Sequence, residues 1–346
     1  MKGFKIISMI LLGFCFSAFK SSAYEWRTYT VGDGLKDNLV RTVAVDAQTG
    51  KVWFGTKDGA SRFDGVHWES YLDKRDVRAI LVEETNKIWF GTDQGVFLKE
   101  GGRFSQFLSD LFIQDIALDR QGVKWIATRT GIRSTVDGIT REDYNQIELN
   151  LVETVLSLPK LADELSKYGI KVSELEYVRT SVTSITIDKN DVKKLATNVI
   201  FKCEKYTFIV SGVSSFDNIN WEFIEPTVGS HQSEKKLIED DKSVCITTSA
   251  TFDKQSTLWY SKRGRGAFVF ANHKILHHYL SQDINQDGRW FGTQSPITIQ
   301  DLDGDGQKEV VAVAETGYDL QPRGIYVYDL MSGEKKWPYP VGPHVG

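Results

Sequence analysis

The sequence is poor in the residues on which most enzyme and metal-site signatures depend. It has 3 cysteines, 6 histidines and 7 prolines among 346 residues. It contains no G-x-S-x-G, H-E-x-x-H or glycine-rich phosphate loop, so hydrolase, zincin and nucleotide chemistry have no motif here. His277 and His278 are adjacent, and on a strand they would point to opposite faces and could not share one metal. We therefore expect a protein that is not an enzyme.

The chain also lacks an excess of positive charge. Its 42 lysines and arginines are outnumbered by 46 aspartates and glutamates, which gives a formal net charge of −4. Binding to nucleic acid needs a basic stripe that releases phosphate counterions, so no nucleic-acid partner is expected. Beyond the N-terminus, no apolar run is long enough to cross a bilayer, and no transmembrane segment is expected in the mature chain.

The N-terminus has the layout of a secretory signal peptide. Lys2 and Lys5 give a basic start, residues 6–19 are mostly apolar, and residues 21–23 are small. This pattern predicts a signal peptide over residues 1–23 and an exported mature chain, in the periplasm or outside the cell.

Removal of this segment changes both the charge and the cysteine count. Its three lysines take the formal net charge of the mature chain to about −7. Cys15 is lost with it, which leaves Cys203 and Cys245. In an oxidising compartment these two can form one disulfide; the alternative is two unpaired thiols.

One phrase recurs at a fixed interval in the first half of the chain. It reads KVWFGTKDGA from residue 51, KIWFGTDQGV from 87 and VKWIATRTGI from 123. Each unit also has an alternating apolar run that ends in an acidic residue, and a second short strand after a glycine turn. Four short strands in about 36–40 residues make one propeller blade. The sequence therefore predicts an all-β fold, a β-propeller of four-stranded antiparallel blades, with its first blades in residues 24–143.

The indoles of the repeat are expected to pack between blades. A large indole can fill the wedge between neighbouring blades, and the small Gly-Thr pair after it allows close approach of the chain. The alternative, a platform for stacking sugars, is less favoured at a strict repeat position. A fourth copy over residues 251–270 keeps the six-residue step from an aspartate to the tryptophan but not the interval of 36, so the blade-packing residues are expected to be Trp53, Trp89, Trp125 and Trp259.

The first unit resembles the two-component-regulator propeller repeat. The motif of that family is present as Asp33–Leu35, Asn38, Asp46, Trp53–Thr56 and Gly59. The resemblance covers residues 26–143 and, less completely, 244–280. It implies ligand sensing or extracellular binding. In full-length sensors of the family the propeller precedes a membrane helix and a kinase, and this sequence shows neither.

Residues 144–243 interrupt the repeat. NLVETVLSLPKLADELSKYG, from 150, and DKNDVKKLATN, from 188, read as helices, and strand-like runs follow them. The favoured interpretation is a small α/β insertion in the propeller, and the alternative is a pair of degenerate blades. Residues 244–282 then read as a further blade.

An acidic turn near the end predicts a calcium site. Residues 299–313 read IQDLDGDGQKEVVAV, and alternating carboxylates on a tight turn converge on a hard cation. Place twelve of the loop is Ala312 and a strand follows, so this is not an EF-hand. The run resembles the integrin-type FG-GAP/VCBS calcium repeat, here over residues 283–346. The resemblance implies a structural calcium held by Asp301, Asp303, Asp305, the Gln307 carbonyl and Glu309.

Two further expectations concern this last blade. A second, less complete acidic run gives Asp283, Asn285 and Asp287 as another metal site. The alternative for the main run is a solvated acidic turn without metal. The chain ends at WPYPVGPHVG, a phrase that leads into another blade in such repeats, so we expect a chain truncated at its C-terminus.

Together these features predict an exported, calcium-stabilised, non-enzymatic propeller that binds or senses an extracellular glycan or protein ligand. One alternative is a propeller-fold polysaccharide lyase or glycosidase, because fold alone does not exclude that class. Another is a structural, adhesin-like surface protein.

Overall fold

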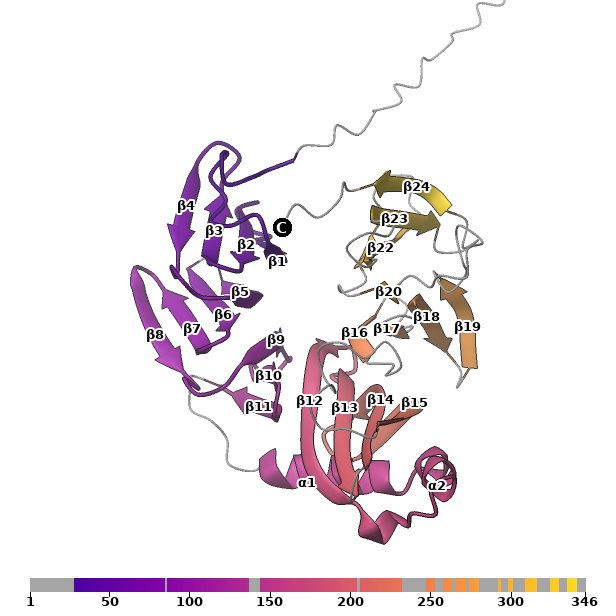
Figure 1. Ribbon diagram of the computed structural model, residues 1–346. Helices are drawn as coiled ribbons and strands as arrows, with labels where there is room; N and C mark the ends of the chain where they lie inside the picture. The colour runs from indigo at the N-terminus through magenta and orange to yellow at the C-terminus, as the bar shows by residue number, and fades with distance from the viewer. Residues whose placement is uncertain are drawn as a thin grey trace, which may run out of the picture.

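The computed structural model describes most of the chain from residue 28 to residue 340, so the predicted signal peptide lies outside the described residues. The described residues are 28–84, 86–136, 144–203, 206–231, 247–252, 258–262, 266–271, 274–279, 292–293, 298–300, 309–315, 324–329 and 335–340. Within them, antiparallel sheets follow one another around a common centre (Figure 1). The strands β1, β5, β9, β12 and β16 lie nearest the centre.

Three sheets come from the first half of the chain. Blade 1 consists of β1 (Val40–Val45), β2 (Val52–Thr56), β3 (Gly59–Phe63) and β4 (Trp68–Tyr71). Blade 2 consists of β5 (Val77–Glu84), β6 (Lys87–Thr92), β7 (Gly95–Glu100) and β8 (Arg103–Phe107). Blade 3 has three described strands, β9 (Ile113–Leu118), β10 (Lys124–Thr128) and β11 (Gly131–Thr135).

Three more sheets complete the described part of the ring. Blade 4 consists of β12 (Glu176–Ile187), β13 (Lys193–Cys203), β14 (Tyr206–Phe216) and β15 (Trp221–His231). Blade 5 consists of β16 (Thr247–Phe252), β17 (Leu258–Lys262), β18 (Gly266–Ala271) and β19 (Lys274–Tyr279). Blade 6 contains β20 (Gly292–Thr293), β21 (Thr298–Gln300), β22 (Glu309–Glu315), β23 (Gly324–Asp329) and β24 (Lys335–Pro340). The predicted all-β propeller of antiparallel blades is confirmed.

The threonine and the last glycine of the repeat close the turn between the second and third strands. In blade 2, Thr92 Oγ1 donates to the carbonyl of Gly95 at 2.9 Å, and blades 1 and 3 repeat this bond. Gly95 has a φ of 102°, and a Cβ there would lie 2.6 Å from the carbonyl oxygens of Phe107 and Leu108. Only glycine fits this position without strain, which explains why the turn repeats.

The indoles and the first glycine of the repeat shape the contact between blades. Trp89 is fully buried and packs with Ile113, Ile116 and Ile126 of blade 3. A Cβ added at Gly91 would lie 2.6 Å from Ile113 Cγ2, so glycine is what lets the next blade come close. Trp53 and Trp125 are buried in the equivalent clusters.

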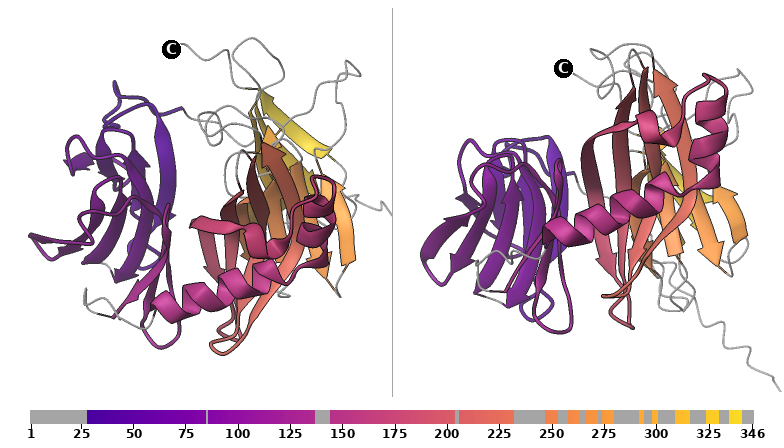
Figure 2. Two further views of the ribbon diagram at one scale, coloured as in Figure 1. Left: turned by 60° about the horizontal axis from the view of Figure 1, so that its bottom comes forward. Right: turned by 90° about the horizontal axis from the view of Figure 1, so that it is seen from below.

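Residues 144–231 form helices outside the ring and a sheet within it. α1 (Tyr144–Leu156) contacts β11 of blade 3 and β15 of blade 4 (Figure 2). α2 (Pro159–Ser166) begins at the proline, and a short 3-10 helix, η1 (Val172–Glu174), leads to β12. Blade 4 lies between blades 3 and 5, so the strands within residues 176–231 are themselves a blade of the ring. The helix predicted from residue 150 is confirmed.

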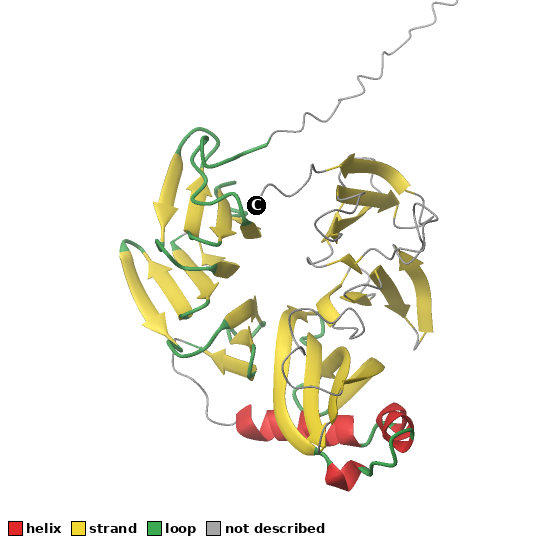
Figure 3. Ribbon diagram, in the orientation of Figure 1, coloured by secondary structure: helices red, strands yellow, loops and turns green. Residues whose placement is uncertain are grey.

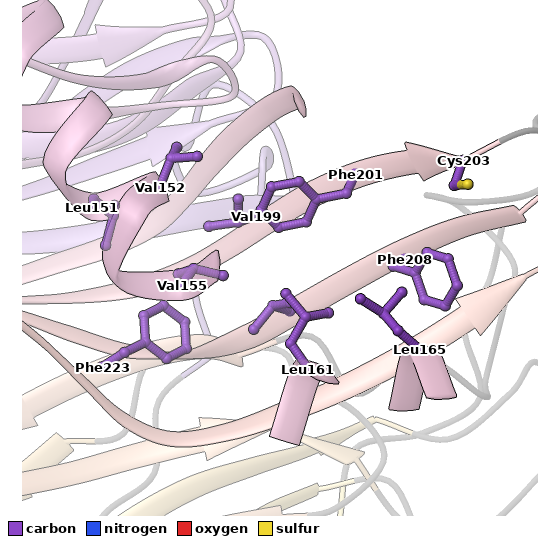
Figure 4. Packing of buried hydrophobic residues seen from close by; sticks show 11 residues of the cluster. Leu151, Val152, Val155, Leu161, Leu165, Val199, Phe201, Cys203, Phe208 and Phe223 are labelled. Atoms are coloured by element: carbon purple, nitrogen blue, oxygen red, sulfur yellow. The ribbon is translucent and has the colours of Figure 1, made fainter. Parts of the chain in front are cut away.

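The two helices cover the outer part of blade 4 (Figure 3). Leu151, Val155 and Leu165 from the helices are buried against sheet residues that include Phe201 and Phe208 (Figure 4). Each buried aliphatic side chain of this size contributes about 1.5–3 kcal/mol. The long strands of blade 4 therefore have an apolar face that the two helices help to keep from water.

The helix predicted from residue 188 is wrong, because that run forms a turn and the start of β13. DKNDVKKLAT, from 188, repeats DRQGVKWIAT, from 119, with lysine in the place of tryptophan. Asp119 Oδ1 accepts the N–H groups of the residues two and four places later, at 3.0 and 2.8 Å. Asp188 Oδ1 does the same, at 2.7 and 2.9 Å. The two aspartates therefore fix the same turn.

A lysine of blade 3 connects it to the tryptophan of blade 2. Lys124 Nζ lies 2.8 Å from Glu83 Oε1 and 5.0 Å from the centroid of the Trp89 ring. The Trp89 indole N–H donates to the other oxygen of Glu83 at 2.7 Å. Burial would raise the pKa of Glu83, but the hydrogen bonds from Lys124 and Trp89 outweigh it and lower the pKa. One carboxylate thus holds an indole of its own blade and a cation of the next.

The same contact joins blades 3 and 4. Lys193 Nζ lies 2.8 Å from Asp191 Oδ2, 3.6 Å from Asp119 Oδ2 and 5.0 Å from the centroid of Trp125. The Trp125 indole donates to Asp119 Oδ2 at 2.8 Å. Burial would raise the pKa of Asp191, but the hydrogen bond from Lys193 helps to hold it below its ordinary value. Lys193 is buried, and the two carboxylates beside it balance its positive charge.

The face of blade 1 that points away from blade 2 is exposed and apolar. Val43 is 54% exposed and Val45 is 58% exposed. The residues equivalent to Val43 in later blades are buried. Ile116 of blade 3 packs on Trp89 of blade 2, and Ile185 of blade 4 packs on Trp125 of blade 3. This is the face that a preceding blade covers elsewhere in the ring. The expected additional blade stays a prediction.

Replacing Lys193 with alanine tests the contact between blades. We expect Lys193→Ala to lower the free energy of unfolding by about 3 kcal/mol or more, because Asp119 and Asp191 would lose their cation while buried. Denaturant unfolding measures the change. Lys189→Ala, in the exposed part of the same turn, should change the free energy by no more than about 0.5 kcal/mol. Equal effects of the two substitutions would contradict this account.

Candidate functional site

The first three blades place equivalent residues together at one end of their inner strands. The residue after the second strand donates its backbone N–H to the residue before the first strand. These bonds join Lys57 to Leu39 at 3.1 Å, Asp93 to Asp76 at 3.2 Å, and Arg129 to Phe112 at 3.3 Å. The backbone is therefore repeated at this end of the blades, while the side chains differ from blade to blade.

Two arginines at one repeat position share a single carboxylate. Arg41, on β1, holds both oxygens of Asp76, with Nε at 3.0 Å and Nη2 at 3.3 Å. Arg78, at the same place on β5, lies with Nη1 3.0 Å from Asp76 Oδ2. The Asp76 N–H donates to Asp93 Oδ1 at 3.1 Å, which orders the start of β5. Blades 1 and 2 are thus joined by a pair of guanidinium groups on one aspartate.

A third arginine extends this group to blade 3. The guanidinium carbon of Arg129 lies 3.6 Å from the centroid of the Phe112 ring, and that of Arg78 lies 5.0 Å from it. Burial, and the nearby charges of Arg41 and Arg129, lower the pKa of Arg78, although Asp76 acts in the opposite direction. We call Arg41, Arg78 and Arg129, with Asp76 and Phe112, the arginine cluster.

The arginine cluster is suited to bind an anion. A guanidinium group presents several N–H donors in a rigid fork that matches a carboxylate or phosphate. The sequence does contain a signal for it, since Arg41 and Arg78 follow the first valine of VRTVAV and VRAILV. The packing residues dominate the pattern of the repeat, and these arginines lie between them, at positions that the repeat motif does not define.

Asp115, on β9, is a second ionisable group on the inner strands. Its carboxylate accepts the Ile116 N–H at 2.9 Å and, from blade 4, the Ile185 N–H at 2.9 Å. Burial raises the pKa of Asp115 to about 6, and the hydrogen bonds, including one with Ser184, only partly oppose this. Asp115 therefore joins blades 3 and 4 and changes its charge in mildly acidic solution.

The predicted calcium residues fall mostly outside the described part of the chain. Glu309 begins β22; its carboxylate is fully buried, and Lys336 Nζ lies 2.6 Å from Oε1. The other predicted ligands of the main and second sites lie outside the described residues: Asp301, Asp303, Asp305, Gln307, Asp283, Asn285 and Asp287. In the described residues, no three His, Cys, Asp or Glu are grouped so that they could hold a metal.

The remaining predicted residues are placed as follows. Cys203 is buried at the end of β13, and Cys245 lies outside the described residues, so the disulfide stays a prediction. Trp259 lies on β17, opposite Val269 of β18 and Thr251 of β16. No helix in the described ranges is both long and apolar enough to span a membrane.

The raised pKa of Asp115 predicts a dependence of stability on pH. The folded state favours the protonated carboxyl, so its contribution is present below pH 3.8, the ordinary pKa, and is lost as pH rises to about 6. Relative to Asp115→Asn, the unchanged protein should therefore lose about 1–3 kcal/mol of stability between pH 4 and pH 7. Urea unfolding across this range measures the difference.

A control separates this effect from general titration. Asp110→Asn, in the exposed turn before β9, should give a stability curve that runs parallel to that of the unchanged protein. If the Asp115→Asn curve were also parallel, Asp115 would have no altered proton affinity in the folded state.

No family model matches the chain, and no curated protein matches it in sequence. Among solved structures, the chain is similar to YCF48 bound to D1 peptide (10% identity, 86% of this chain, 80% of that chain, TM-score 0.46). It is also similar to regucalcin, a calcium-binding protein of Agrobacterium tumefaciens (13% identity, 80% and 81% covered, TM-score 0.43).

A third similar structure is the extracellular domain of a hybrid two component system from B. thetaiotaomicron. The identity is 15%, 90% of this chain is covered, and the TM-score is 0.32. The chain spans 60% of the length of that domain. These similarities concern the fold alone.

Proposed function

We propose that this chain is an exported, non-enzymatic propeller that binds or senses an extracellular glycan or protein ligand at the arginine cluster. The observation that supports the proposal is that three arginines from three successive blades come together at one end of the inner strands, two on the carboxylate of Asp76 and the third over the ring of Phe112. Loop ends on a rigid scaffold are where propellers and similar folds carry their binding residues.

The charge balance of the arginine cluster differs from that of the contacts between blades. Lys193 has Asp119 and Asp191 beside it, so that contact is neutral or negative. The arginine cluster holds more positive charge than Asp76 can neutralise. Ionisable groups that are held against their own repulsion are frequent at functional sites, although structural networks can also shift pKa values. The excess charge is the reason to place a ligand here.

Export and sensing rest on the sequence. The predicted signal peptide over residues 1–23 places the mature chain in the periplasm or outside the cell. The resemblance of residues 26–143 to the two-component-regulator propeller repeat supports ligand sensing. An enzyme of the polysaccharide lyase or glycosidase class, and an adhesin-like structural protein, remain the alternatives that the experiments below distinguish.

Calcium is part of the proposal as a stabilising ion at residues 301–309. The carboxylates of Asp301, Asp303 and Asp305 are hard oxygen donors of the kind that calcium prefers. Glu309 already has Lys336 as its cationic partner, so the aspartates are the better residues on which to test the site.

Thermal unfolding with calcium and then with a chelator tests this part of the proposal. Calcium at a hundred times its Kd should stabilise the fold by about 2.7 kcal/mol, which is a shift of several degrees. Asp303→Ala should abolish the shift, whereas Lys57→Ala, in the turn after β2 of blade 1, should keep it. If the melting temperature did not respond to calcium, the acidic turn would be a solvated loop.

A ligand screen tests the binding function. The mature chain is mixed with a panel of glycans and extracellular proteins, and its melting temperature is recorded beside an assay for reducing ends and unsaturated products. A binding module should be stabilised by some member of the panel and release no product. Release of sugar products would assign the chain to the lyase or glycosidase class. A response to calcium alone would favour the structural alternative.

A further inference from the structure

We propose that the arginine cluster is a subsite for the carboxylate of a small acidic ligand, of the chemical class of a sugar acid. This inference rests on the proposed binding function and deepens it by naming the group that is recognised. Three observations support it. The cluster already holds the carboxylate of Asp76, its positive groups outnumber the negative ones, and its arginines are partly exposed.

Asp76 shows that the cluster has the geometry to hold a carboxylate. Arg41 grips both oxygens of Asp76 through Nε and Nη2, which is the two-pronged arrangement that guanidinium and carboxylate groups favour. Arg78 adds a third bond through Nη1. Two of the three guanidinium groups are therefore already held in place by a carboxylate of the protein.

Arg129 supplies guanidinium N–H donors that Asp76 does not occupy. Its guanidinium group lies over the ring of Phe112, which fixes its plane, and in the described residues no protein acceptor takes its N–H groups. Stacking on an aromatic ring leaves the edge of a guanidinium, where the donors are, able to bind a ligand. The guanidinium carbon of Arg78 lies 5.0 Å from the centroid of the same ring, so both arginines are next to Phe112.

A bound carboxylate would relieve the repulsion within the cluster. The three guanidinium groups outnumber the carboxylate of Asp76 and that of Asp93, whose Oδ1 accepts the Asp76 N–H, and one more negative group brings these charges to balance. The proximity of Arg41 and Arg129, together with burial, already disfavours the charged form of Arg78. An anion beside Phe112 therefore gains more than it would from a single exposed arginine, where an ion pair contributes about 0–1 kcal/mol.

The exposure and the overall charge favour a small ligand. The side chains of Arg41 and Arg78 are 31% and 26% exposed, so a ligand reaches only part of each group. The chain as a whole is negatively charged, with 46 acidic against 42 basic residues, and a long polyanion would be repelled along most of its length. A single carboxylate on a small molecule can contact the arginine cluster without approaching the negatively charged remainder of the surface.

Isothermal titration with glucuronate and glucose tests the proposal, because the two sugars differ in one carboxylate. At low salt the mature chain should bind glucuronate and show no heat with glucose, and added salt should weaken the binding. Arg129→Gln should weaken glucuronate binding at least tenfold, since it removes the free fork without breaking an ion pair of the protein. Arg129→Lys, which keeps the charge but not the fork, should lose part of the affinity.

Arg103→Gln is the matched control. Arg103 lies on β8, the outer strand of blade 2, and its substitution should leave glucuronate binding unchanged. Equal binding of glucuronate and glucose, equal loss in Arg129→Gln and Arg103→Gln, or binding of an acidic peptide but not of glucuronate would each overturn the proposal. If glucuronate failed while another ligand from the screen bound the chain, the carboxylate subsite would fall and the binding function would stand.

Discussion

The junction of blades 2 and 3 and the junction of blades 3 and 4 depend on the same contact. An indole of one blade donates to an acidic side chain at the end of its inner strand, and a lysine of the next blade lies over the indole and pairs with the same acid. Between blades 1 and 2 the place of the lysine is taken by Ile88, which packs on Trp53. The contact thus tolerates a cation or an aliphatic group, provided that the side chain covers the indole.

The ends of the inner strands combine a structural role with the candidate site. Arg41 and Arg78 join blades 1 and 2 through Asp76, while the hairpin turn keeps the strands of each blade in register. At that end blade 1 has Arg41, blade 2 has Arg78, and blade 3 brings Arg129 over Phe112. A rigid repeat with a variable rim is how such folds acquire binding sites.

The sequence was sufficient to predict the repeat and its turns. The prediction failed in the run from residue 188, where one residue of the motif changes. In blade 4 Lys194 stands in the place of the indole, and without an aromatic landmark DKNDVKKLATN has the spacing of a helix. Local propensity is weak compared with pairing between strands, and β13 is held between β12 and β14. Lys194 instead reaches Ser215 on β14, and burial lowers its pKa.

The sequence by itself determined the period, the strands of the WFGT units and the glycine turns, because these follow from local backbone geometry and from alternation of apolar residues. Only the tertiary structure decided which charged residues meet. Arg41 and Asp76 are 35 residues apart, and Lys193 and Asp119 are 74 apart, yet closure of neighbouring blades brings each pair into contact. Contacts between blades depend on the angle and spacing of packed sheets, which no local pattern in the chain specifies.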